Sequence, residues 1–403
     1  MPAPSIYLDN NATTRIDPRV AEAMATIQRD RLVNPASQHS DGRKARRVLE
    51  EARLTIATCL GCRTKGMAAD QILFTSGGTE ANNLAIFGLL EGREGDLVVS
   101  SIEHPSILGA AESVAKRGKH RVRYLPVGKN GQISIDEWND VLLGHRLASQ
   151  GKCAEGRIAM VSLMLANNET GVIQPFQEIV NSARLEGILV HADAVQAIAK
   201  IPFSFEKSNL DAMTVTAHKF HGPVGIGSLV LKAAVPLVPI HFGGFQQLGL
   251  RPGTESVELA VGFAAAIQLA TNDLLERNER MTEFRIQLEN LLLENTRSPK
   301  IICANEARLP HTISLAYPGI ERQALQMALD REGLSCGTGS ACASGSGQPS
   351  HVLKAMGASN SILRSAIRLS LSAETTSQEI VEAARIITLV VNRFPYPNLF
   401  DEP

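Results

Sequence analysis

A glycine-rich turn stands between a short apolar run and a helical pattern near residue 77. The segment is Ser76-Gly77-Gly78-Thr79, which follows the apolar run 72–75. Glycines let the backbone turn tightly, and the start of a helix offers N–H groups that have no partner within the helix. A phosphate group suits such a turn. The turn by itself is explained equally well as an ordinary connection between a strand and a helix.

Two further side chains stand just beyond apolar strand patterns. Asp193 follows the run 188–192, and Lys219 follows the run 212–216. Ligands of open α/β sheets bind outside the carboxyl ends of the strands. There a carboxylate can pair with a protonated ring nitrogen, and a semi-buried lysine can form a Schiff base. Taken singly, Asp193 is more simply a helix N-cap and Lys219 a surface lysine.

The order of these three features decides between the readings. A phosphate turn, an aspartate after a strand and a lysine after the next strand form the layout of pyridoxal-phosphate enzymes. Gln196 lies three residues beyond Asp193 and would face the same side if a helical turn follows. The sequence therefore predicts a pyridoxal 5'-phosphate site built from Gly78, Asp193, Gln196 and Lys219.

The elements that must position this site form an alternating pattern. Short apolar runs, several of them apolar on both faces, alternate with helical stretches such as 79–90 and 177–186. This alternation favours an α/β domain with a mostly parallel sheet covered by helices on both sides. A long helical pattern over 256–294 leads to a second unit. That unit has expected strands at 311–316 and 367–371, expected helices at 321–332 and 376–392, and a Gly/Ser-rich loop at 335–350.

Across nearly the whole chain, from about residue 6 to about residue 390, the ordered motifs resemble the NifS/IscS-type cysteine desulfurases. The motifs are 7–14 (YLDNNATT), 34–37 (NPAS), 75–80 (TSGGTE), 103–104 (EH), 167–171 (NNETG), 191–196 (HADAVQ), 218–219 (HK) and 339–342 (GSAC). The resemblance implies the α/β fold type I of class V aminotransferase-like enzymes. It implies a large cofactor-binding domain at 17–260 with a mostly parallel seven-stranded sheet. A smaller α+β domain would comprise 1–16 and 261–403 and carry the loop 335–350.

The resemblance also implies roles for single residues around the cofactor. Lys219 would hold the cofactor through a Schiff base, and Asp193 would pair with the pyridine nitrogen. Gln196 would bond the ring hydroxyl, with Asn168 close by toward the substrate. His104 would stack on the ring and assist proton transfer; the alternative is a histidine that merely caps a loop. The phosphate would be held by Gly78, Thr79, Thr216 and His218.

Substrate contacts and a second subunit follow from the same resemblance. Arg368 would clamp the substrate carboxylate as a bidentate donor, helped by Asn34 and Asn168. The alternative for Arg368 is a surface ion pair. Thr254 would reach the phosphate of a neighbouring subunit, so a homodimer with shared active sites is implied. Gln247-Leu248 replaces the usual Glu-Arg pair, and we expect this loss of charge to affect docking of a partner.

The sulfur acceptor is expected at Cys342, in a small and flexible segment that resembles the mobile catalytic loop of the family. A nucleophilic thiol needs partial exposure, which a loop tip provides. Cys336 is an alternative that could relay sulfur. Cys59 and Cys62 form a CxxC without a second pair at zinc-site spacing, so a structural role is favoured and no metal is expected.

The implied reaction converts L-cysteine to L-alanine, with sulfur held as a persulfide on Cys342 and passed to an acceptor or scaffold protein. Iron–sulfur cluster assembly or another sulfur-transfer pathway would receive it. The alternatives are a selenocysteine lyase-like enzyme, a dedicated desulfurase for nucleic-acid thiolation, and a catalytically silent scaffold. Intact Lys219, Asp193, His104 and Cys342 argue against the silent scaffold.

The amino-acid composition narrows the class of protein and its cellular location. The 403 residues carry 40 basic and 41 acidic side chains, so no basic excess argues for direct nucleic-acid binding. No apolar stretch approaches the roughly 20 residues of a membrane helix, and the N-terminal residues lack a signal-peptide pattern. Six scattered cysteines do not form a disulfide framework. We expect a cytoplasmic protein.

Overall fold

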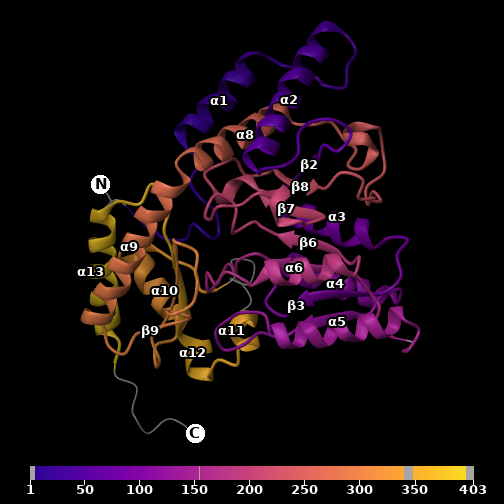
Figure 1. Ribbon diagram of the computed structural model, residues 1–403. Helices are drawn as coiled ribbons and strands as arrows, with labels where there is room; N and C mark the ends of the chain where they lie inside the picture. Colours follow the sequence, from indigo (N-terminus) through magenta and orange to yellow (C-terminus); the bar gives the residue numbers. More distant parts are fainter. Residues whose placement is uncertain (1–4, 154, 340–347, 396–403) are drawn as a thin grey trace.

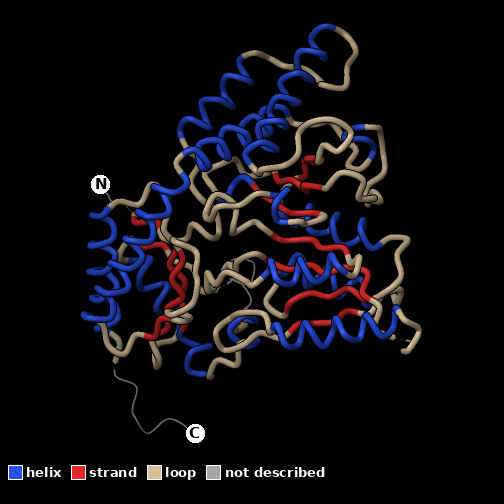
Figure 2. The backbone as a smooth tube through the Cα atoms, viewed as in Figure 1, coloured by secondary structure: helices blue, strands red, loops and turns tan. Residues whose placement is uncertain are grey.

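The computed structural model describes residues 5–153, 155–339 and 348–395. Its helices and strands form a larger and a smaller unit side by side (Figures 1 and 2). Each unit has its own buried apolar cluster, one containing Val98, Val161 and Phe263 and the other containing Leu315, Ile367 and Ile387. The division into a domain of residues 17–260 and a second domain of residues 1–16 and 261–403 stays a prediction.

The larger unit is built on a seven-stranded sheet in the order β2-β8-β7-β6-β5-β3-β4. Strand β8 is antiparallel to both of its neighbours, and every other neighbouring pair is parallel. The strands are β2 (Gln71–Thr75), β3 (Asp96–Ser100), β4 (Val122–Leu125), β5 (Ile158–Met164), β6 (Leu189–Asp193), β7 (Ala212–Thr216) and β8 (Gly227–Leu231). The predicted α/β fold with a mostly parallel seven-stranded sheet is confirmed.

Helices cover both faces of this sheet, which explains why its strands are apolar on both sides. Helices α3 (Gly78–Leu90) and α4 (Pro105–Arg117) share one apolar cluster with one face. The other face packs against a cluster that draws on α2 (Ser40–Cys59), α5 (Ile135–Ser149), α6 (Phe176–Leu185) and α8 (Val257–Asn272). Helices α1 (Pro18–Arg29) and α7 (Phe205–Ser208) complete the unit.

The smaller unit packs helices on one side of a three-stranded antiparallel sheet, ordered β12-β10-β9. A separate parallel pair joins β1 (Ile6–Tyr7) to β11 (Leu334–Ser335), so the N-terminal strand lies with the C-terminal part of the chain. The remaining elements are α9 (Leu274–Asn295), β9 (Lys300–Ile301), β10 (Thr312–Ala316), α10 (Arg322–Arg331), α11 (His351–Ala355), α12 (Asn360–Ser365), β12 (Ala366–Ser370) and α13 (Ser377–Arg393).

Two local predictions need correction. The helical pattern over 256–294 is not one helix, because α8 ends and α9 begins on either side of Asp273. The apolar side of α8 packs in the core of the larger unit as far as Ala270. The chain therefore leaves that core near this break, and α9 packs in the core of the smaller unit. Strand β4 was not predicted, because its exposed Tyr124 and polar Arg123 hide the apolar pattern of an edge strand.

Within the described ranges, no helix is both long enough and apolar enough to cross a membrane.

Candidate active site

A cavity of about 210 Å³ lies beyond the carboxyl ends of β5, β6 and β7, where a parallel sheet offers its ligand site. Side chains from both units line it. They are Asn11, Ala12, Gly78, Thr79, Asn82, His104, Ser106, Met164, Ala166, Asn168, Asp193, Val195, Gln196, Thr216, His218, Lys219 and Arg368. Ten of these are residues predicted from the sequence to hold cofactor or substrate.

Asp193 ends β6 with a buried carboxylate that two donors hold in place. Its Oδ1 accepts from the Val195 N–H at 3.0 Å, and its Oδ2 accepts from Asn82 Nδ2 at 2.8 Å. No ion pair to Asp193 is present among the described residues, although the side chain is only 6% exposed. A buried carboxylate calls for a cationic partner. The protonated ring nitrogen of pyridoxal phosphate is such a partner, so this carboxylate fits the cofactor.

Lys219 lies in a 3₁₀ turn, η1 (Ala217–Lys219), that follows β7 directly. Its Nζ donates to the main-chain oxygens of Asn11 at 2.6 Å and Ala12 at 2.7 Å. The buried Lys200 donates from Nζ to the Lys219 main-chain oxygen at 2.8 Å, which fixes the turn from behind. The primary amine is therefore held at the cavity wall by the N-terminal segment.

His104 is both a helix cap and a cavity residue, so the two readings of this histidine are compatible. Its Nδ1 accepts from the Ser106 N–H at 3.1 Å at the start of α4. Burial lowers the pKa of His104, the nearby Asp193 carboxylate opposes that shift, and Lys219 adds to it. A neutral ring that accepts at Nδ1 carries its proton on Nε2.

The glycine turn lies at the first residues of α3, as expected. Gly78 and Thr79 begin the helix, where the first N–H groups have no partner within it. A Cβ added at Gly78 would lie 3.2 Å from Val195 Cγ2, a tight contact that the Val195 side chain would have to relieve by moving a few tenths of an ångström. The Thr216 hydroxyl donates to the Ile226 main-chain oxygen at 3.1 Å. Burial, followed by the nearby Lys219, lowers the pKa of His218 to about 4.

Arg368, on β12, forms an ion pair that is buried and not on the surface. Its side chain is 2% exposed, with Nη2 2.6 Å from Asp9 Oδ1 and Nη1 donating to the Asn168 main-chain oxygen at 3.0 Å. Its Nε is buried without a hydrogen-bond partner. A guanidinium that is fixed on two sides and still has an unused donor suits an incoming carboxylate.

Three predicted residues do not line this cavity. Asn34 is exposed, and its Oδ1 accepts from the Ala36 N–H at 2.9 Å. Thr254 lies in a separate hollow beside Glu80 and Arg251. Cys342 lies outside the described residues.

Sequence reasoning missed Asn82, the donor that orients Asp193. A signal was available, because Asn82 and its neighbour Asn83 are the only polar residues in the stretch 81–90. Asn82 is 1% exposed. A buried amide in an apolar helix face needs a polar partner. Asn11 and Asp9 were also missed as contacts, since their partners lie hundreds of residues away.

Four of the five cysteines in the described residues are buried or half-buried, which makes their thiols poorer nucleophiles, whereas Cys153 is exposed. Burial raises the pKa of the Cys336 thiol to about 12 and that of Cys303 to about 11. Cys59 and Cys62 are free thiols, and burial raises the pKa of both. No cluster of metal-ligating side chains occurs among the described residues. A sulfur relay through Cys336 therefore has no physical support here.

Gln247 proves to be a structural residue. It is buried, and its amide brackets the backbone of edge strand β2, accepting from the Phe74 N–H at 2.6 Å and donating to the Phe74 oxygen at 2.9 Å. Only the neighbouring Leu248, which is 75% exposed, faces solvent.

Comparison with known proteins identifies the family. The family model for aminotransferase class V matches residues 6–382. The chain belongs to the class V aminotransferase family. A cysteine desulfurase of Sinorhizobium fredii is 38% identical over 392 residues, which cover 96% of this chain and 97% of that protein. An IscS-like cysteine desulfurase of Mycobacterium tuberculosis is 37% identical, with 96% of each chain covered.

Solved structures of similar proteins agree with this membership. A NifS-like protein has a TM-score of 0.85 at 34% identity and covers 96% of this chain and 99% of its own. SspA, solved in complex with cysteine, has a TM-score of 0.76 at 30% identity and covers 92% and 100%. The predictions of fold type I, a NifS/IscS-like family and a pyridoxal-phosphate cofactor are confirmed.

Proposed function

We propose that this class V family member is a cysteine desulfurase that converts L-cysteine into L-alanine and captures the sulfur on Cys342. Its similarity to cysteine desulfurases along nearly its whole length supports the activity. The observation that carries the proposal is one cavity lined by the amine of Lys219, the carboxylate of Asp193 and the guanidinium of Arg368. In the proposed reaction Lys219 is the anchor of the cofactor and the base, Asp193 is the partner of the ring nitrogen, and Arg368 binds the substrate carboxylate.

Each of these residues has a separate role in the proposed reaction. Bound pyridoxal phosphate supplies an electron sink for the carbanion that forms at the substrate Cα. Lys219 would anchor the cofactor through its amine, which hydrogen bonds to the Asn11 and Ala12 main-chain oxygens hold at the cavity wall, and the same amine would then move the Cα proton. The carboxylate of Asp193, held in place by Asn82, would pair with the protonated ring nitrogen. Arg368 binds the substrate carboxylate, and the Nε2–H of the neutral His104 serves as a local proton donor.

Sulfur transfer needs a thiolate that can approach the substrate sulfur. The Cys342 thiolate attacks that sulfur, a new S–S bond forms, and the electron pair of the C–S bond stays on the carbon that becomes the alanine methyl. Support comes from the base of the segment. The backbone of Gly337 pairs with that of Arg368 through bonds of 3.0 and 2.7 Å. Cys342 follows Gly337 by five residues, a length of chain that spans at most about 17 Å.

A homodimer completes the proposal. Thr254 lines a hollow apart from the cavity of its own chain, and Asn34 is exposed, as side chains that serve a neighbouring subunit would be. Sulfur then passes from Cys342 to an acceptor protein for iron–sulfur assembly or another sulfur-transfer pathway. A mixture of Lys219→Ala and Thr254→Arg chains should regain activity that neither has alone. If mixing restores nothing, shared sites are wrong.

The central experiment removes the anchor and the acceptor separately. Lys219→Ala should lose the absorbance of the lysine-bound cofactor at roughly 400 nm and all alanine formation. Lys207→Ala, which removes an exposed lysine on α7, should retain both. Cys342→Ser should keep the absorbance and lose the protein-bound persulfide. If Lys219→Ala retained the band, the cofactor assignment would fail. Alanine release from L-cysteine measured against L-selenocysteine tests the lyase alternative.

A further inference from the structure

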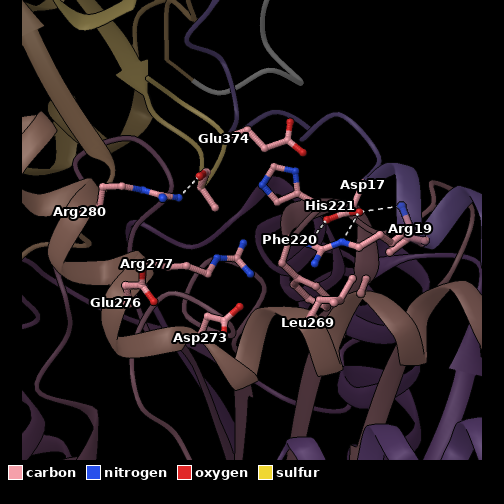
Figure 3. A pocket seen from close by; sticks show the side chains of 13 residues that line it. Asp17, Arg19, Phe220, His221, Leu269, Asp273, Glu276, Arg277, Arg280 and Glu374 are labelled. Atoms are coloured by element: carbon pink, nitrogen blue, oxygen red, sulfur yellow. Dashed lines mark hydrogen bonds and ion pairs between the residues drawn. The ribbon is translucent and has the colours of Figure 1, made fainter. Parts of the chain in front are cut away.

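A second cavity of about 180 Å³ lies where the two units meet, close to the candidate active site in size. It is formed by the start of α1, the end of α8, the start of α9 and the turn before α13 (Figure 3). Phe220 and His221, which also line it, follow Lys219 directly in the chain. No part of the proposed reaction uses this space.

Two side chains in the wall each have a buried nitrogen without a hydrogen-bond partner among the described residues. His221 is 5% exposed, and its Nδ1 bonds the Arg15 main-chain oxygen at 2.9 Å while its Nε2 is buried without a partner. Burial lowers the pKa of His221 to about 4, so the ring is neutral at pH 7. The Arg277 side chain makes no hydrogen bond or ion pair with the described residues, and its Nε is also buried. Buried polar atoms without partners call for a ligand or ordered water.

Arg277 is the available cation of this cavity. Figure 3 shows it extending from α9 into the space between Asp273 and His221. The two other arginines in the wall are already engaged. Arg19 donates to both Asp17 oxygens, at 3.0 and 2.7 Å, and Arg280 donates to the Ala373 main-chain oxygen.

The charged side chains in the wall indicate which charges a ligand of this cavity carries. Besides these arginines, the carboxylates of Asp17, Asp273, Glu276 and Glu374 line the cavity. A dianion such as phosphate would meet four carboxylates, and a simple cation would meet three guanidinium groups. A small zwitterion satisfies both signs, with its carboxylate on Arg277 and its ammonium toward Asp273 or Glu374. His221 Nε2 adds a neutral polar contact.

We propose that this junction cavity binds a small zwitterionic amino acid, at a site separate from the cavity that contains Lys219. The inference goes beyond the proposed function, because the site contains no cofactor residue. It makes one specific prediction about α9: the guanidinium of Arg277 is the carboxylate receptor.

The experiment is a calorimetric titration of holoenzyme with L-alanine while the cofactor absorbance is recorded. Wild type should bind two molecules per subunit, of which only one changes the absorbance. The Arg368→Gln background, which removes the active-site carboxylate clamp, should bind one molecule with no absorbance change. Adding Arg277→Met should weaken that binding by at least about tenfold, the effect of losing a hydrogen bond to a charged group.

Arg285→Met is the matched control. It removes an arginine from the same helix and leaves Glu289 paired with Arg308 at 2.9 Å, so L-alanine binding should be unchanged. Acetate and ethylammonium, which carry one charge each, should bind at least about tenfold more weakly than L-alanine. The proposal is overturned if wild type binds only the molecule that changes the absorbance, if Arg277→Met binds as tightly as its parent, or if acetate matches L-alanine. These readouts do not depend on sulfur release.

Discussion

At the scale of the residue, the candidate site depends on how a buried charge is kept in its charged form. Asp193 is almost fully buried and yet accepts two hydrogen bonds, one of them from Asn82 on the facing helix. Burial disfavours a carboxylate, and donors aimed at it offset that penalty. Asn82 therefore holds the Asp193 carboxylate in place at the cavity wall.

Replacing Asn82 tests this role. Asn82→Ala should lower kcat/KM for L-cysteine by about tenfold, because a hydrogen bond to a charged group contributes about 1.5 to 3 kcal/mol. The cofactor absorbance should shift as well, since the ring nitrogen would lose its proton more readily. Asn83→Ala is the neighbouring control, because Asn83 donates only to the Thr79 oxygen of its own helix at 2.8 Å. Equal kinetics for the two variants would contradict the assignment.

At the scale of the element, the segment that leads to Cys342 pairs at Gly337 with β12, the strand that carries Arg368. Gly337 pairs with Arg368 on the backbone, and a Cβ at Gly337 would lie 2.9 Å from both Arg368 Nη2 and Asp9 Oδ1. Real Cβ atoms do not come that close, so glycine is required for the Asp9–Arg368 pair to keep its place. The carboxylate clamp and the base of the cysteine segment are thus one unit.

Gly337→Ala should displace the Arg368 side chain without touching the cofactor. We expect KM for L-cysteine to rise by about tenfold, which corresponds to about 1.4 kcal/mol of lost carboxylate binding. The cofactor absorbance should not change. Gly109→Ala, in helix α4 with open space around its Cα, should have no effect on KM. An unchanged KM in Gly337→Ala would show that the clamp does not depend on this contact.

At the scale of the whole molecule, the burial of neutral histidines makes the free energy of unfolding depend on pH. Burial lowers the pKa of His191 to about 3 and the pKa values of His218 and His221 to about 4. Their ordinary value in an unfolded chain is about 6.5. Between about pH 6.5 and 4 the unfolded chain binds protons that the folded chain does not. Stability is therefore full above pH 6.5 and falls as the pH drops through this window.

Each such histidine should contribute about 1.4 kcal/mol per pH unit to the slope of the free energy of unfolding against pH in that window. Urea unfolding of the holoenzyme between pH 7 and pH 5 measures the sum. His191→Gln, which can still bond the flanking Ser162 and Thr214 hydroxyls, should reduce the slope by about one histidine's share. His241→Gln changes an exposed side chain and should leave the slope as in wild type. A His191→Gln slope equal to wild type would refute this account.

The sequence by itself determined the order of elements and the residues around the cofactor. Short apolar runs, several of them apolar on both faces, indicated a covered parallel sheet, and the turn at Gly78 with Asp193 and Lys219 indicated the cofactor. These signals are local, because each consists of a strand and the few residues that follow it. Parallel strands then bring their carboxyl ends to one edge whatever the details of packing.

Only the tertiary structure decided which side chains serve those residues from a distance. Asn82 meets Asp193 across 111 positions, Asp9 meets Arg368 across 359, and Gly337 is required by both members of that pair. The junction cavity around Arg277 joins segments from both ends of the chain. No local pattern encodes such contacts, since they form only when elements far apart in the sequence pack together. The cofactor site could thus be predicted from the sequence. The side chains that hold its residues in place could be found only from the tertiary structure.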